Sequence, residues 1–147
     1  MKYNGQAIAR QTKNIVVGGF EFKISTLPVG YIREFDKLWP IVEPPVKVTE
    51  SVKEGRKEVE QFNDPKFLTE YSERAYHKAI YSVYLLLRND ERIQFENTPT
   101  SIESMKALAK EFSESGISDG DILELVKVTQ NFDYISAKEI EKSDKVF

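Results

Sequence analysis

The sequence has no cysteine, and it has a single histidine, His77. The absence of cysteine excludes disulfide bridges, thiolate zinc sites, iron–sulfur clusters and cysteine nucleophiles. One histidine cannot form a histidine-rich metal site. Because His77 falls on the charged side of a long helical pattern, we expect it to be a surface residue.

Long apolar runs are also lacking. The longest apolar-rich segment, IYSVYLLL at 80–87, is much shorter than the ~18 apolar residues that a membrane span requires. The first residues contain no apolar stretch of signal-peptide length. The net charge is −3, so no overall positive field favours nucleic acid or an anionic membrane. We therefore expect a cytoplasmic protein with no nucleic-acid partner and no membrane partner.

Two short segments have some likeness to ligand-binding loops but fail in detail. The Gly18-Gly19 pair belongs to no G-x-x-x-x-G-K-[ST] or G-x-G-x-x-G pattern. In DGDILE at 119–124 the glycine is second instead of sixth, which excludes a calcium loop of the EF-hand type. Acidic residues at a helix start are explained by the helix dipole alone. With no nucleophile motif elsewhere, we expect no enzyme, no cofactor, no metal and no small-molecule substrate.

What the chain does have is the length of one domain and many aromatic residues. Its 147 residues include 9 Phe, 7 Tyr and 1 Trp, which favours a packed core over disorder. The polar residues 1–13 predict a frayed N-terminal arm. After it, NIVVGGFEFKIS at 14–25 predicts a β-hairpin turning at Gly18-Gly19, with a glycine bulge in one longer strand as the alternative.

A short helix is predicted between Val29 and Trp39, ended by Pro40. Ile32, Phe35 and Trp39 share one side of it, so we expect these three side chains to pack against the β element. The next segment, 41–61, contains Pro44-Pro45 and charges of both signs. It predicts a linker or extended arm, with a weak helix interrupted by Gly55 as the alternative.

The rest of the chain predicts helices. Asp64 as N-cap and Pro65 at the first position begin a long helix that ends at RNDER, 88–92, with Arg74 on its charged side. A second helix is predicted to begin at a capping box of Thr100 and Glu103 and to end at Gly116. A third helix follows SDGD. The predicted fold class is α+β, mostly α: a small N-terminal β-hairpin or strand element with a short helix, then a linker and a bundle of about three helices.

The predicted divisions of the chain are an N-terminal arm plus β–helix module at 1–40, a Pro-rich and charged linker at 41–61, a helical domain at 62–135, and a charged tail at 136–147. Residues of the short helix, the linker and the long helix are candidates for binding another protein, with core packing as the alternative for the aromatic ones: Tyr31, Phe35, Trp39, Pro44, Pro45, Tyr81 and Tyr84.

One stretch resembles a known family. VVGGFEFKISTLPVGYIREFDKL is similar to the N-terminal part of tail assembly chaperones of long-tailed bacteriophages. In these proteins a short β segment with a Gly–aromatic motif leads through a Leu-x-x-Gly turn, here Leu27 and Gly30, into a helix. The segments NDERIQFENTPTS and ESGISDGDILELV are similar to the helical half of the family, so the likeness extends over about residues 14–130.

The resemblance implies a non-enzymatic role in virion assembly within the host bacterial cytoplasm. Proteins of this family coat the tape measure protein, keep it soluble and help to recruit tail tube subunits. The family pattern assigns no individual functional residues. The alternative is a structural virion component, such as a neck, tail or baseplate protein, held by protein–protein contacts. Homo-oligomerisation stays open.

Overall fold

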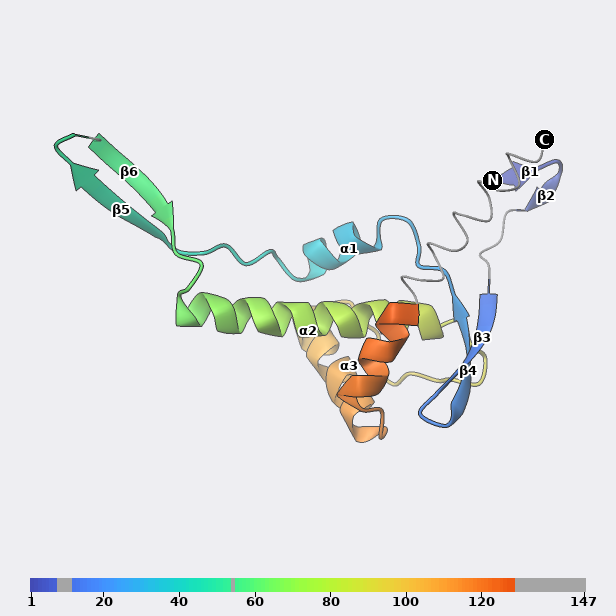
Figure 1. Cartoon of the computed structure of the whole chain (residues 1–147). Coiled ribbons are helices and arrows are strands. Elements are labelled where there is room, and N and C mark those ends of the chain that lie inside the picture. Colours follow the sequence, from blue (N-terminus) through green and yellow to red (C-terminus); the bar gives the residue numbers. More distant parts are fainter. Residues whose placement is uncertain (8–11, 54, 129–147) are drawn as a thin grey trace.

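The computed structural model describes residues 1–7, 12–53 and 55–128. The elements follow one another as β1 (Lys2–Tyr3), β2 (Gln6–Ala7), β3 (Thr12–Val17), β4 (Phe20–Ser25), α1 (Tyr31–Leu38), β5 (Val46–Ser51), β6 (Gly55–Glu60), α2 (Pro65–Leu87) and α3 (Ile102–Glu114). A further helix occupies 119–128. The long helix α2 runs through the middle of the molecule, with the β5–β6 hairpin projecting beyond one end and the β3–β4 hairpin at the other (Figure 1).

The predicted fold class, mostly α with one small β element, is wrong. The described residues form three separate two-stranded antiparallel sheets, β1–β2, β3–β4 and β5–β6, together with four helices. Two of these hairpins lie where the sequence predicted a frayed arm, 1–13, and a linker, 41–61. Their strands are exposed on both faces, so neither hairpin has the sustained apolar side that marks a half-buried strand. The alternative of a weak helix around Gly55 is also wrong.

The β3–β4 hairpin agrees with its sequence pattern. Gly18 and Gly19 have φ values of 61° and 82°, and Val17 pairs with Phe20 across this two-residue turn. The hairpin, and not the glycine bulge, is therefore confirmed. Within β4, Ile24 is fully buried, whereas Phe20 at the tip is exposed.

Helix α1 begins after Gly30, whose φ of 81° lies in the left-handed region that favours glycine. Phe35 is fully buried, as predicted, and Trp39 is partly buried, but the rings that they contact outside this segment, Tyr81 and His77, belong to α2 and not to the β element. Ile32 is 46% exposed, so its predicted packing against the β element is wrong. The helix ends at Leu38, just before Pro40.

The long helix is confirmed: it begins at Pro65 as predicted and ends at Leu87, just before RNDER. The Asp64 side chain accepts a hydrogen bond from the Phe67 N–H at 2.9 Å, and Pro65 occupies the first helical position. The predicted capping box of the next helix is displaced by one residue. Ser101, instead of Thr100, caps α3, and Ser104 takes the reciprocal role given to Glu103.

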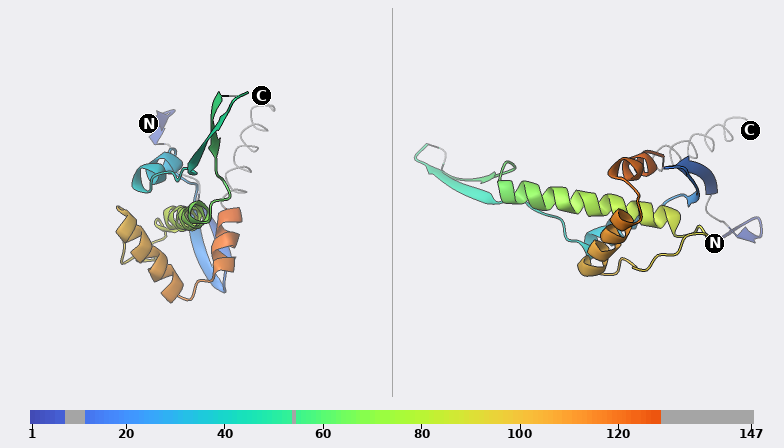
Figure 2. Two further views of the ribbon diagram at one scale, coloured as in Figure 1. Left: turned by 90° about the vertical axis from the view of Figure 1, so that its left-hand side faces the viewer. Right: turned by 90° about the horizontal axis from the view of Figure 1, so that it is seen from below.

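The core is shared between helices and strands, so it is not a bundle of three helices. It surrounds the second half of α2 and takes buried apolar side chains from β3, β4, α1, α2, α3 and the 119–128 helix: Val17, Ile24, Phe35, Ile80, Val83, Leu86, Leu87, Met105, Leu108, Ala109, Phe112, Ile122 and Leu125. Viewed along α2, α1 and α3 lie on one side of it and the 119–128 helix on the other (Figure 2). The end of the predicted helical domain, 129–135, and the predicted tail, 136–147, lie outside the described residues.

Asp90 fastens β4 to the end of α2. Its carboxylate, 2% exposed, accepts a hydrogen bond from the Lys23 N–H at 2.8 Å. It also accepts bonds from the Arg92 backbone N–H, Nε and Nη2 at 2.9–3.0 Å. The Arg92 guanidinium and these N–H groups hold the pKa of Asp90 far below its usual range. The carboxylate is therefore charged in the folded protein at neutral pH.

Candidate protein-binding surface

His77 has a structural position, so the prediction of a surface residue is wrong. It is 7% exposed, and its ring stacks on Trp39 with 4.6 Å between ring centroids. Its Nδ1 lies 2.7 Å from the Glu73 carbonyl oxygen. Because a carbonyl oxygen can only accept, Nδ1 carries the proton and donates this bond. His77 thereby holds Trp39 against α2.

Arg74, one turn before His77 on α2, also holds the end of α1 and Trp39 against α2. It forms an ion pair with Asp36, and its Nη2 donates to the Trp39 carbonyl oxygen at 3.0 Å. Its guanidinium carbon also lies 5.0 Å from the centre of the Phe35 ring, a favourable cation–π distance. The sequence placed Arg74 on the solvent side of the helix, but α1 covers that side. The two α2 residues together fix α1 and the residues directly after it, Trp39 and Pro40.

A groove of about 310 Å³ runs along α2 beside this contact. Residues at helical spacing on α2 form its floor, Tyr31 at the start of α1 lies at one side, and Val126 of the 119–128 helix lies at the other. The full lining is Tyr31, Tyr71, Arg74, Ala75, Lys78, Ala79, Ser82 and Val126. Arg74 is already paired with Asp36. Ala75, Ala79 and Val126 give the groove apolar surface, and the tyrosines, Lys78 and Ser82 add polar groups to it.

The first half of α2 continues this surface. Over residues 65–76, Phe67 and Arg74 are buried. Large apolar side chains nevertheless stay exposed in this range: Tyr71 is 57% and Leu68 47% exposed. The sequence pattern predicts core packing for the apolar side of this helix, with contact to a partner as the alternative for part of it, and does not specify which part is exposed. The available signal was that Phe67, Leu68, Tyr71 and Tyr76 spread over a wider arc of the helix than the stripe that one neighbouring layer covers.

The residues predicted to bind a partner are dispersed. Tyr31 lines the groove, and Phe35 is fully buried in the core. Trp39 lies between His77 and the Lys106 ammonium group, which is 5.8 Å from its ring centre. Pro44 is half-buried and Pro45 exposed, ahead of β5.

Tyr81 and Tyr84 pack within the molecule. The Tyr81 ring lies 5.4 Å from the Phe35 ring, and the Tyr84 ring lies 4.9 Å from Phe95. Burial and the nearby Glu34 carboxylate raise the pKa of Tyr81. Both tyrosines are half-buried, so the structure does not bring them into the groove with Tyr31.

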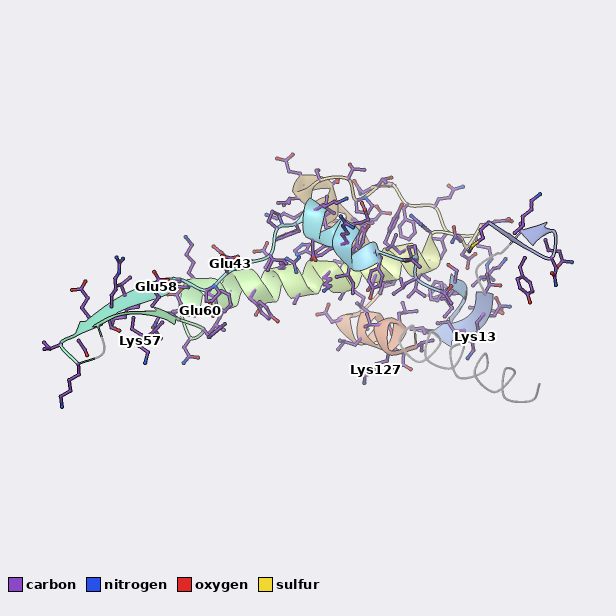
Figure 3. All side chains as sticks on the ribbon, turned by 90° about the horizontal axis from the view of Figure 1, so that it is seen from above. Lys13, Glu43, Lys57, Glu58, Glu60 and Lys127 are labelled. Atoms are coloured by element: carbon purple, nitrogen blue, oxygen red, sulfur yellow. The ribbon has the colours of Figure 1, made fainter. Side chains whose placement is uncertain are left out.

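The β5–β6 hairpin is the second exposed feature. All twelve strand residues are exposed, and their extensive contacts are between the two strands themselves. The hairpin closes at its base through the Gln61 N–H, which donates to the Pro45 carbonyl oxygen at 2.8 Å. Figure 3 shows long side chains projecting from this arm, with Lys57, Glu58 and Glu60 labelled.

No protein-family model, curated protein or solved structure matches the chain. Within residues 1–7, 12–53 and 55–128, no three histidine, aspartate or glutamate side chains are grouped so that they could hold a metal ion. In the same part of the chain, no helix combines the length and apolar character needed to cross a membrane. The features that remain are the groove, the exposed half of α2 and the hairpin, all suited to contact with another protein.

Proposed function

We propose that this chain is a non-enzymatic tail assembly chaperone of a long-tailed bacteriophage, acting in the host bacterial cytoplasm. It binds the tape measure protein, keeps that long helical chain soluble and helps to recruit tail tube subunits. The observation that carries the proposal is the groove along α2, which continues into the exposed apolar side chains of its first half.

A groove of this kind suits an amphipathic helix. Helix-in-groove recognition places apolar side chains at i, i+3, i+4 and i+7 of the partner into an apolar furrow. Here Tyr71, Ala75 and Ala79 lie on one side of α2 at four-residue steps, with Tyr31 and Val126 flanking them. Small alanine side chains on the floor allow a close approach of the partner helix.

The order of the N-terminal elements also supports the proposal. The β3–β4 hairpin turns at a glycine pair followed by Phe20, and the chain then passes Leu27 and the left-handed Gly30 into α1. This is the Gly–aromatic and Leu-x-x-Gly arrangement in which the chain resembles tail assembly chaperones. Its α1 helix then supplies one wall of the groove.

Co-expression with a candidate tape measure protein tests the proposal. The expected result is a large increase in the soluble fraction of the tape measure protein and its co-purification with this chain. Tyr71→Glu, in the groove, should remove the effect because it places a charge where an apolar side chain of the partner packs. Val16→Glu is the matched control, since Val16 is 72% exposed on β3 and is not among the groove residues. Unchanged solubility with the unsubstituted chain contradicts the proposal.

A permanent virion component is the second candidate, favoured by the exposed β5–β6 arm, because such an arm suits a lasting contact between neighbouring subunits. Mass spectrometry of purified virions separates the two functions. A chaperone leaves the finished tail and is absent from the particle, whereas a neck, tail or baseplate protein is present in it.

A further inference from the structure

Among the residues that the structure describes, none outside the β5–β6 hairpin packs against it extensively enough to account for its formation. A two-stranded hairpin with both faces in water is marginally stable, and a third strand or a packed helix is normally required. Here Val46, Val48 and Val59 are 41–53% exposed, and the arm projects away from the end of α2 (Figure 1). A contact with another chain would supply the missing burial.

The pairing register divides the charged residues of the hairpin between its two faces. Residues directly opposite one another in an antiparallel pair share a face, and neighbours along a strand alternate. One face therefore carries Val46, Val48, Glu50, Arg56, Glu58 and Glu60, and the other carries Lys47, Thr49, Ser51, Lys57 and Val59. The first, the acidic face, has three glutamates and one arginine, and the second, the basic face, has two lysines and no acidic residue. Their formal charges are −2 and +2.

We propose that the β5–β6 hairpin is a self-association element, in which the acidic face of one copy packs on the basic face of the next copy. The two faces of a single hairpin point in opposite directions, so they cannot pair with each other. A second copy of this chain is complementary in charge to both faces, because it offers a basic face to the acidic one and an acidic face to the basic one. A purely anionic or purely cationic partner would leave one face without its complement.

The apolar residues agree with this arrangement. Val46 and Val48 lie among the glutamates of the acidic face, and Val59 lies beside Lys47 on the basic face. Stacking the faces therefore buries valine against valine while carboxylates meet ammonium groups at the margin. Because the two contacting faces differ, the contact is heterologous and extends from copy to copy in a ring or an open row. This interaction does not involve the α2 groove and stands apart from the proposed binding of a tape measure protein.

Sedimentation velocity of the full chain over a wide range of protein concentrations tests the proposal. At about 0.1 M salt, where the Debye length is about 10 Å, we expect the sedimentation coefficient to rise with concentration. Lys47→Glu with Lys57→Glu makes both faces acidic, and Glu58→Lys with Glu60→Lys makes both faces basic. Each variant alone should sediment as a monomer.

Mixing the two variants gives the decisive measurement. The acidic faces of the first variant then meet the basic faces of the second in both directions, so the mixture should associate although neither component does. This restoration also excludes misfolding as the reason for the loss. Lys13→Glu with Lys127→Glu is the matched control, because it makes the same change of charge at exposed residues (Figure 3) and should associate like the unsubstituted chain. A monomeric unsubstituted chain, self-association of either variant alone, or a mixture that stays monomeric overturns the proposal.

Discussion

At the scale of single residues, the burial of a helical side chain depends less on its position in the helix than on which neighbouring element covers that side of the helix. Phe35 and Ile32 lie three positions apart on α1, yet Phe35 is fully buried and Ile32 is 46% exposed. The difference arises because α1 is held on α2 through its C-terminal end, by Arg74 and His77, which places Phe35 in the core.

Alanine substitution of these two residues measures that difference. Phe35→Ala should lower the free energy of unfolding by about 3–5 kcal/mol, because it leaves a cavity in a closed core. Ile32→Ala, the matched control on the same helix, should lower it by less than about 1 kcal/mol, since much of the side chain is already in water. Urea unfolding followed by Trp39 fluorescence gives both values. Equal losses for the two variants contradict the observed orientation of α1.

Asp90 makes stability depend on pH. Its pKa is lower in the folded protein than in the unfolded chain, because hydrogen bonds from Arg92 and the Lys23 N–H favour the charged form. Its contribution is therefore complete above the pKa of an unfolded aspartate, about 3.9. It declines as the pH falls below that value and is lost once the pH falls through the folded pKa.

Asp90→Asn should lower the free energy of unfolding by about 2 kcal/mol at neutral pH, because it weakens charge-assisted hydrogen bonds at a buried site. The loss should shrink as the pH is lowered below about 4, where the original carboxyl group is itself becoming protonated. Urea unfolding at a series of pH values measures both effects. Glu91→Gln, at an exposed neighbour, is the control and should behave like the unsubstituted chain; a pH-independent difference between Asp90→Asn and the original chain argues against this account.

At the scale of elements, the sequence predicts best those that bury one side. The β3–β4 hairpin and α2 were predictable because Phe22 and Ile24 alternate with polar residues along the strand. Likewise, Ile80, Val83 and Leu87 recur at three- and four-residue steps along the helix. The β5–β6 hairpin was not, because neither face is buried and its charges alternate without an apolar side. The same limit applies to the candidate site. Tyr31 was predicted as a contact residue, but the groove depends on where α1 and the 119–128 helix meet α2, which periodicity does not specify.

Removing the β5–β6 arm tests its independence from the body. Replacing residues 46–60 by a short Gly-Ser turn should change the free energy of unfolding by less than about 0.5 kcal/mol, because no residue of the arm belongs to the core. The ends of the excised segment are already close, since Pro45 and Gln61 share a hydrogen bond. Urea unfolding of the shortened chain measures the change. A loss comparable to that of Phe35→Ala would falsify the assignment of the arm as an appendage.

At the scale of the whole molecule, the core joins parts of the chain that the arm separates. Val17, Ile24 and Phe35 precede the β5–β6 hairpin, whereas the core residues of α2, α3 and the 119–128 helix follow it. Contacts of β4 and α1 with α2 hold the two parts together. The β5–β6 hairpin is therefore an insertion outside the core, and the protein should tolerate a break in the chain at the tip of this hairpin.

Two separate chains, 1–52 and 55–147, should therefore assemble when they are co-expressed, and the second should co-purify with a tagged first. Pairing of β5 with β6 could also join them, so the experiment needs a variant that spares the strands. Ile24→Asp in the first chain places an uncompensated carboxylate in the core and should abolish co-purification while leaving β5 intact. Val16→Asp, on the exposed side of the neighbouring strand, should leave assembly unchanged. If Ile24→Asp has no effect, the hairpin alone joins the chains and the shared core does not hold the two parts together.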